Sequence, residues 1–185
     1  SVTNAANLMT LTSSLRYTSV NINGDANANL TYSGLPTTLV IESASGSLNN
    51  VTLTNTKTTA GTISTDATGT VTITTTGDTT VTASTASTVN ITSSAQATLS
   101  ANTATTVIVL ANEEALITAN AAESVTIFAG DGIDTTSTSA IDSTLTSSNT
   151  KNITLNVQGR TAATVLNINS APTVNQINVS GTQNV

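Results

Sequence analysis

Four consecutive copies of one 18-residue unit occupy Gly69–Ala140 and decide the fold. The copies read GTVTITTTGDTTVTASTA (69–86), STVNITSSAQATLSANTA (87–104), TTVIVLANEEALITANAA (105–122) and ESVTIFAGDGIDTTSTSA (123–140). They align without a gap, so apolar residues fall into columns. A fixed period of this length predicts structural repeats that stack on one another. The main columns are Val71/Val89/Val107/Val125, Ile73/Ile91/Val109/Ile127, Val81/Leu99/Ile117 and Ala83/Ala101/Ala119.

Each unit contains two short stretches in which apolar and polar residues alternate, and such alternation predicts β-strands. The Asn-Gly and Asp-Gly turns that connect antiparallel hairpins are nearly absent from the unit, which argues against a hairpin stack. A coil in which each turn lies on the one before explains the common register better. The sequence therefore predicts an all-β fold, a parallel β-solenoid with 18-residue coils.

Outside this central part the same pattern continues with a wider spacing. Apolar residues recur at intervals of twelve in several places, for example from Val51 to Ile63. We therefore expect one solenoid segment with irregular wider coils in 1–68, regular coils in 69–140 and wider coils again in 141–185. Residues 134–151 have few apolar residues and are expected to form a loop. The chain is expected to be a fragment or the mature form of a longer protein.

The composition argues against several classes of function. The chain has four basic and ten acidic residues, which gives a net charge of −6. No basic patch for nucleic acid is therefore expected. The chain has no Cys and no His, which excludes Cys-His and Ser-His-Asp catalytic sites, and we expect no enzyme. The longest run of large apolar residues is Val107–Leu110, which is far too short to span a bilayer, so no membrane insertion is expected.

Acidic residues gather in the third and fourth copies, at the same phase of the repeat. Glu113 and Glu114 lie in the third copy, and Asp131 and Asp134 lie in the fourth. Carboxylates stacked on adjacent coils repel one another unless a cation bridges them, and carboxylate oxygens are ligands that Ca²⁺ prefers. These four residues are therefore the candidate Ca²⁺ ligands, and the alternative is a solvated corner of the coil.

The segment AGDGID (129–134) resembles the glycine-rich nonapeptide of the repeats-in-toxin (RTX) family, from which it departs at Ala129 and by occurring once. The Cys-free chain, rich in Thr, Ser, Asn and Ala, also resembles the bacterial surface-layer (S-layer) proteins of the type I-secreted, RTX-linked kind, such as those of Campylobacter and Caulobacter. This resemblance implies a secreted structural protein at the cell surface, self-assembly with identical subunits, calcium dependence and attachment to surface polysaccharide.

Four large apolar residues occupy outward phases of the third and fourth copies, and such exposed apolar clusters mark contacts with other proteins. These candidate interface residues are Ile108, Leu110, Leu116 and Phe128. The alternative is that the loop expected at 134–151 folds over them.

Two other functions compete with the surface layer. The stalk or passenger region of a secreted adhesin would use the same fold, but it would be uniformly polar. Ice binding would use a flat array of Thr residues such as the one at 70–74. That array changes in the following copies, where Asn90 and Ile108 replace Thr72, so ice binding is the remote alternative.

Overall fold

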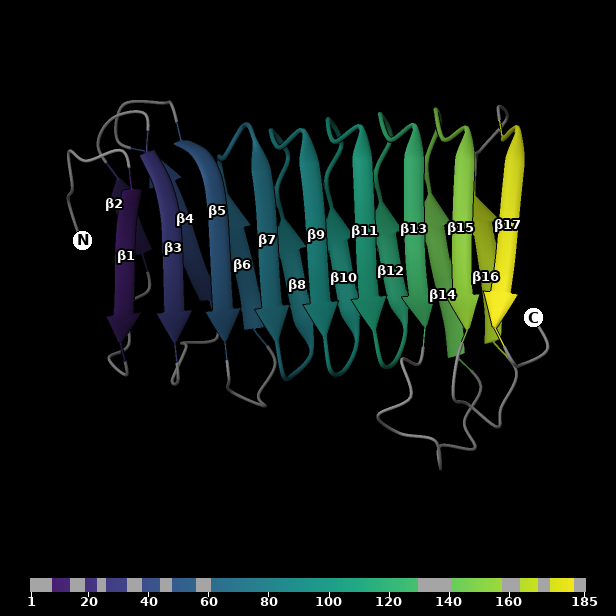
Figure 1. Ribbon diagram of the computed structural model, residues 1–185, viewed down its shortest axis with the longest axis horizontal. Helices are drawn as coiled ribbons and strands as arrows, with labels where there is room; N and C mark the ends of the chain where they lie inside the picture. Colours follow the sequence, from purple (N-terminus) through teal and green to yellow (C-terminus); the bar gives the residue numbers. More distant parts are fainter. Residues whose placement is uncertain are drawn as a thin grey trace.

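The computed structural model describes nine stretches of the chain, and almost all of their residues belong to β-strands or to the corners between strands. The described residues are 8–13, 19–22, 26–32, 38–43, 48–55, 61–129, 141–157, 164–169 and 174–181. Within these stretches there are seventeen strands and no helix. Successive strands alternate between two sheets, so that two strands make one coil of the stack (Figure 1).

The first sheet has nine strands and contains every odd-numbered strand in chain order. These strands are β1 (Leu8–Ser13), β3 (Ala26–Tyr32), β5 (Leu48–Asn55), β7 (Thr70–Thr75), β9 (Thr88–Ser93), β11 (Thr106–Ala111), β13 (Ser124–Ala129), β15 (Asn152–Val157) and β17 (Gln176–Gly181).

The second sheet has eight strands and contains the even-numbered ones. These are β2 (Ser19–Ile22), β4 (Thr38–Ser43), β6 (Gly61–Thr65), β8 (Thr79–Thr82), β10 (Ala97–Ser100), β12 (Ala115–Thr118), β14 (Ile141–Thr146) and β16 (Thr164–Asn169). Neighbouring strands in both sheets are parallel, so the predicted parallel β-solenoid is confirmed.

The strand register confirms the predicted columns in the centre of the stack. Val71 pairs with Val89, which pairs with Val107, and Val107 pairs with Val125, so that each step equals one repeat unit. In the second sheet Val81 pairs with Leu99, which pairs with Ile117. The repeat in the sequence therefore sets the pairing register, because a shift by one residue would turn every Val and Ile out of the core.

The coils toward both ends are wider, as expected. Leu39 pairs with Ile63, and Ile153 pairs with Ile177, and both steps are longer than one repeat unit. The coil that opens with the fourth copy is wider still, since Val125 pairs with Ile153. The fourth copy therefore shares the register of the repeat in its first strand only.

The prediction of a loop at 134–151 is wrong for the second half of this segment. Residues 141–146 form β14, which lies between β12 and β16 in the second sheet, and Leu145 is fully buried there opposite Ile117. Two apolar residues, Ile141 and Leu145, were too few to indicate this strand from the sequence. Residues 134–140 lie outside the described residues.

The core fills the space between the two sheets, and each central coil contributes the same set of side chains. The first sheet supplies a Val and an Ile or second Val, the second sheet supplies Val, Leu or Ile, and Ala residues fill the corners. In the coil built from the second copy these are Val89, Ile91, Leu99, Ala101 and Ala104, all at most 1% exposed. Burying one large aliphatic side chain stabilises the fold by about 1.5–3 kcal/mol, so stability grows with each coil added.

The same core columns reach β17, where they are uncovered. Ile177 and Val179 are 50% and 52% exposed, although their partners Ile153 and Leu155 in β15 are buried. Within the described residues no strand lies on the other side of β17. Ile177 and Val179 are therefore exposed because, among the described residues, no further coil covers them.

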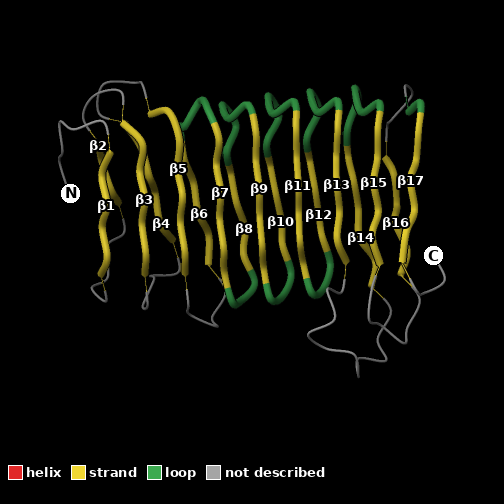
Figure 2. Tube along the Cα trace, viewed as in Figure 1, coloured by secondary structure: helices red, strands yellow, loops and turns green. Residues whose placement is uncertain are grey.

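The corners between the sheets are also hydrogen-bonded from coil to coil, and Figure 2 shows them as regular loops along the stack. At one corner the backbone N–H of Ser87 donates to the carbonyl of Gly69 at 3.0 Å, and Thr105 donates in the same way to Ser87 at 2.9 Å. The Ser87 and Thr105 hydroxyls donate to the same two carbonyls. Ser and Thr at the corners therefore provide hydrogen bonds to backbone carbonyls that lie outside the ladders of the two sheets.

Candidate functional site

Besides a column formed by Thr70, Thr88, Thr106, Ser124, Asn152 and Gln176, the outer face of the nine-stranded sheet presents two further columns of outward side chains. The first column contains Thr52, Thr72, Asn90, Ile108, Thr126, Thr154 and Asn178, and the second contains Thr54, Thr74, Thr92, Leu110, Phe128 and Ser180. Most of these residues carry a hydroxyl or an amide. The face is therefore polar but uncharged, and three apolar residues interrupt it.

These three residues, Ile108, Leu110 and Phe128, are adjacent and are called here the apolar strip. Leu110 pairs directly with Phe128 on the neighbouring strand, and Ile108 lies two positions before Leu110 on the same face of β11. Strands in a sheet lie about 4.8 Å apart, so the three side chains form one continuous patch. Ile108 is 37% exposed, whereas Leu110 and Phe128 are half-buried.

The fourth predicted interface residue, Leu116, does not belong to this patch. It lies in β12, in the other sheet, where its partners are Thr98 and Thr144. Its neighbours Ala115 and Ile117 are buried and Leu116 is half-buried, so its side chain faces outward from the eight-stranded sheet. The position of a residue within the repeat does not distinguish the two sheets, because the two strands of one repeat belong to opposite sheets.

The loop that was expected to cover the patch does not do so in its described part. Residues 141–146 belong to β14 in the eight-stranded sheet, and residues 147–150 form the corner that leads to β15. Ile108 remains one of three large apolar side chains that are exposed among the described residues, together with Ile177 and Val179.

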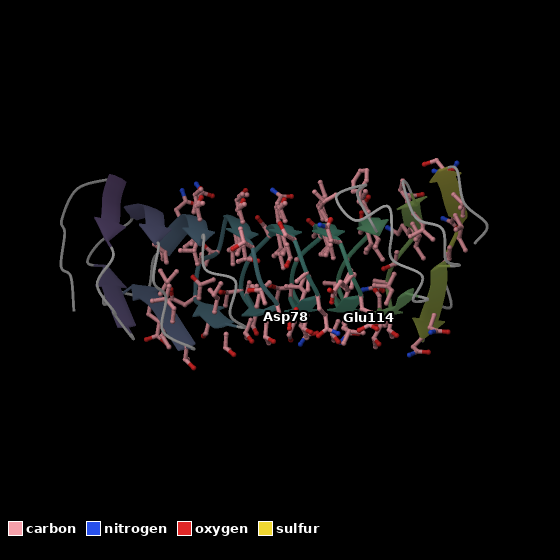
Figure 3. All side chains as sticks on the ribbon, turned by 90° about the horizontal axis from the view of Figure 1, so that it is seen from below. Asp78 and Glu114 are labelled. Atoms are coloured by element: carbon pink, nitrogen blue, oxygen red, sulfur yellow. The ribbon has the colours of Figure 1, made fainter. Side chains whose placement is uncertain are left out.

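The acidic residues lie at the corner that leads from the first sheet to the second. Gln96 links two of them: its Nε2 donates to Oε2 of Glu114 at 2.6 Å, and its backbone N–H donates to Oδ1 of Asp78 at 3.3 Å. Asp78, Gln96 and Glu114 occupy the same phase on three successive coils. Figure 3 shows Asp78 and Glu114 along the side of the stack formed by the eight-stranded sheet. An amide therefore separates the two carboxylates.

This arrangement changes the interpretation of the predicted Ca²⁺ ligands. Glu113 is exposed, and Glu114 is half-buried and hydrogen-bonded to Gln96. Asp131 and Asp134 lie outside the described residues. Among the residues that the structure describes, no group of three or more acidic side chains is close enough to hold a metal ion. Glu113 and Glu114 by themselves supply fewer oxygen ligands than the roughly six to eight that Ca²⁺ takes.

One corner of the first regular coil is built around a glycine that the sequence analysis did not single out. The Gly69 N–H donates to the Asn49 carbonyl at 2.8 Å, and the Thr70 N–H donates to Oδ1 of Asn50 at 2.6 Å. A Cβ at position 69 would lie 2.5 Å from Oδ1 of Asn50 and 2.8 Å from the Asn49 backbone oxygen. No side chain fits there, so Gly69 is required where the wider coils give way to the regular ones.

On each face at least one of the Thr ranks that ice binding would need is interrupted. On the nine-stranded sheet Thr52 and Thr72 are followed by Asn90 and Ile108. On the eight-stranded sheet Thr62, Thr80 and Thr98 are aligned, and Leu116 then ends the rank. An array several ranks wide is therefore broken on each face, although single hydroxyl ranks such as Thr70, Thr88, Thr106 and Ser124 continue.

Comparison with known proteins gives no match, either to a family model, to a curated protein or to a solved structure. Among the described residues no helix is long and apolar enough to cross a membrane. The features that bear on function are therefore the stack itself, the apolar strip on one face, and the acidic corner on the other side.

Proposed function

We propose that this chain is a structural element of a bacterial surface layer, a stiff β-solenoid that is secreted and assembles with identical copies at the cell surface. The observation that carries the proposal is the parallel stack of seventeen described strands in two sheets, in register apart from one shift at Ala26/Ala28. Each coil is paired with the next in the two sheets, and the described corners from Leu48 onward add further hydrogen bonds between coils. Such a stack resists bending and proteolysis because few backbone groups are free to unfold locally.

The surface chemistry supports a structural role over a catalytic one. Uncharged Thr, Asn and Ser side chains cover most of the larger face, and the chain contains neither Cys nor His. The resemblance in composition to type I-secreted S-layer proteins supports the same role. Attachment to cell-surface polysaccharide and a contribution of Ca²⁺ belong to this proposal, with Glu113, Glu114, Asp131 and Asp134 as the ligands to test.

Electron microscopy of the purified protein, with and without Ca²⁺, tests the proposal. Ordered two-dimensional sheets are expected at high protein concentration, and sheets that dissolve on adding a chelator would support the role of Ca²⁺. Sheets that form equally well with chelator present would support the layer function and would show that it does not need Ca²⁺. Isolated rods under all conditions would overturn the layer function and favour the adhesin stalk.

A further inference from the structure

The nine-stranded sheet contains no charged residue in any of its strands, from β1 to β17. The eight-stranded sheet has two, Glu42 in β4 and Asp142 in β14. The remaining charged residues of the described stretches lie at corners between strands: Asp66, Asp78, Glu113, Glu114, Glu123 and Lys151. The larger sheet therefore differs from the rest of the molecule in its electrostatics.

The corner that leads into the larger sheet has three charged residues among the described ones, Asp66, Glu123 and Lys151, and two of them are paired. Glu123 directly precedes β13 and Lys151 directly precedes β15, and Nζ of Lys151 lies 2.7 Å from Oε1 of Glu123. Each charge of this pair compensates the other at the edge of the sheet. The acidic residues Asp78, Glu113 and Glu114 lie at the opposite corner, which follows the strands of the nine-stranded sheet and leads into the eight-stranded sheet.

This charge distribution determines which face a second copy can approach. The chain carries a net charge of −6, so two copies repel each other when their acidic corners meet. The outer face of the nine-stranded sheet brings no carboxylate of one copy against a carboxylate of the other. A cationic partner would gain nothing on this face, because the face offers it no negative charge.

The same face has the anatomy of a protein interface. An apolar centre surrounded by polar, hydrogen-bonding residues and depleted of charge is the usual arrangement at protein contacts. Here the apolar strip of Ile108, Leu110 and Phe128 is the centre, and Thr and Asn residues of the flanking strands are the rim.

We infer that a second copy of this chain packs against the outer face of the nine-stranded sheet, with the apolar strips of the two copies in contact across a two-fold axis. This inference rests on the proposed function and specifies its lateral contact. Two-fold packing is the arrangement by which one patch can serve both partners. The contact does not involve Ca²⁺, because no acidic residue lies in the strands that form the face.

Sedimentation of purified protein over a range of concentrations tests the contact. The variant Ile108→Thr/Leu110→Thr introduces the residue type found at Thr126 and Thr92 in the same columns, so the strand and its register are kept. We expect its association constant to fall at least about tenfold, because two apolar side chains leave the contact. Circular dichroism and the melting temperature of each variant verify that it is folded.

Leu116→Thr is the matched control, since Leu116 is an outward, half-buried Leu on the opposite sheet. It should leave the association constant unchanged, and so should a chelator. Val179→Thr tests the uncovered end of the stack as the alternative contact. If Val179→Thr or Leu116→Thr abolishes association and the Ile108/Leu110 variant does not, the inferred face is wrong. The same conclusion follows if the wild-type protein remains monomeric at every concentration.

Cross-linking provides a second measurement that does not depend on weakening the contact. Because the chain has no Cys, Ile108→Cys and Leu116→Cys each create a single reactive thiol. A short bis-maleimide reagent should link two copies through position 108 and should not do so through position 116. Equal cross-linking of both variants would contradict the inference.

The failure of this inference can be distinguished from the failure of the proposed function. If ordered sheets form in the microscope and the Ile108→Thr/Leu110→Thr variant forms them equally well, the layer function stands and the contact is elsewhere. If the protein dimerises through this face and never forms sheets, the contact is correct and the layer function fails.

Discussion

Gln96 donates a hydrogen bond from Nε2 to Oε2 of Glu114, one coil further along the stack, at a distance of 2.6 Å. Its backbone N–H donates to Oδ1 of Asp78, one coil back, so this residue lies between two carboxylates of the same phase. In a parallel stack every residue has neighbours of equal phase about 4.8 Å away on both sides. An amide at this position therefore prevents three acidic side chains from stacking.

Replacing the amide by a carboxylate tests this role. Gln96→Glu should lower the free energy of unfolding by about 1–2 kcal/mol at low salt, because a hydrogen bond is lost and like charges become neighbours. Salt should reduce the loss by screening. The new carboxylate would add ligands for Ca²⁺, so millimolar Ca²⁺ should stabilise this variant more than the wild type. Urea denaturation with and without Ca²⁺ measures both effects.

The control for this experiment is Gln96→Met, which removes the hydrogen bond without adding charge. Its smaller loss of stability should be insensitive to both salt and Ca²⁺. Equal stability of Gln96→Glu and the wild type at low salt would contradict the separating role of the amide.

Gly69→Ala should destabilise the protein by about 1–3 kcal/mol, the usual cost of forcing extra atoms into a packed site. The added Cβ would lie 2.8 Å from the Asn49 backbone oxygen, and a backbone atom cannot rotate away as a side chain can. Gly61→Ala is the matched control, since nothing lies within 4 Å of a Cβ at that position. A loss of stability as large in Gly61→Ala as in Gly69→Ala would show that the contact with Asn49 does not decide the result.

Interior Ala residues should resist enlargement, because they are fully buried where the chain passes from one sheet to the other. Ala101 is 0% exposed, and Ala101→Leu should cost about 1–3 kcal/mol of stability by overpacking. Thr98→Leu adds a comparable apolar side chain on the outside of the neighbouring strand β10, beside Leu116, and should be tolerated. Thermal unfolding of the two variants distinguishes them, and equal melting temperatures would mean that the corner has room.

Lys151→Met should change the free energy of unfolding by less than about 1 kcal/mol. The pair with Glu123 is short, but the two side chains are 48% and 60% exposed, and exposed pairs contribute little. The Lys151 backbone N–H also donates to the Glu123 carbonyl at 3.1 Å, so the corner is held without the side chain. A larger loss of stability, measured by urea denaturation at moderate salt, would show that the corner depends on this ion pair.

The sequence predicted the part of the fold that repeats. Val71, Val89, Val107 and Val125 recur once in each repeat unit and do pair, since identical inward residues reinforce one register along the stack. It did not predict β14, because a strand with only two apolar residues becomes recognisable only when the neighbouring strand supplies its register.

The candidate site was predicted only in part, because the repeat alone does not assign its strands to two sheets. Ile108, Leu110 and Phe128 do form one patch, whereas Leu116 faces the other way, since the two strands of one repeat belong to opposite sheets. The hydrogen bond between Gln96 and Glu114 depends on side-chain geometry, although the repeat does place these residues at the same phase. The charge-free larger sheet becomes visible only after the strands are assigned to two sheets.

Electron diffraction from the assembled protein tests the central claim most directly, namely that in-register parallel stacks lie side by side to form a wall. We predict ordered sheets with a sharp reflection at about 4.8 Å along one in-plane direction, the strand spacing, and lattice reflections at larger spacing across it. Sheets without an in-plane reflection at about 4.8 Å, or an assembly that never orders in two dimensions, would contradict the account.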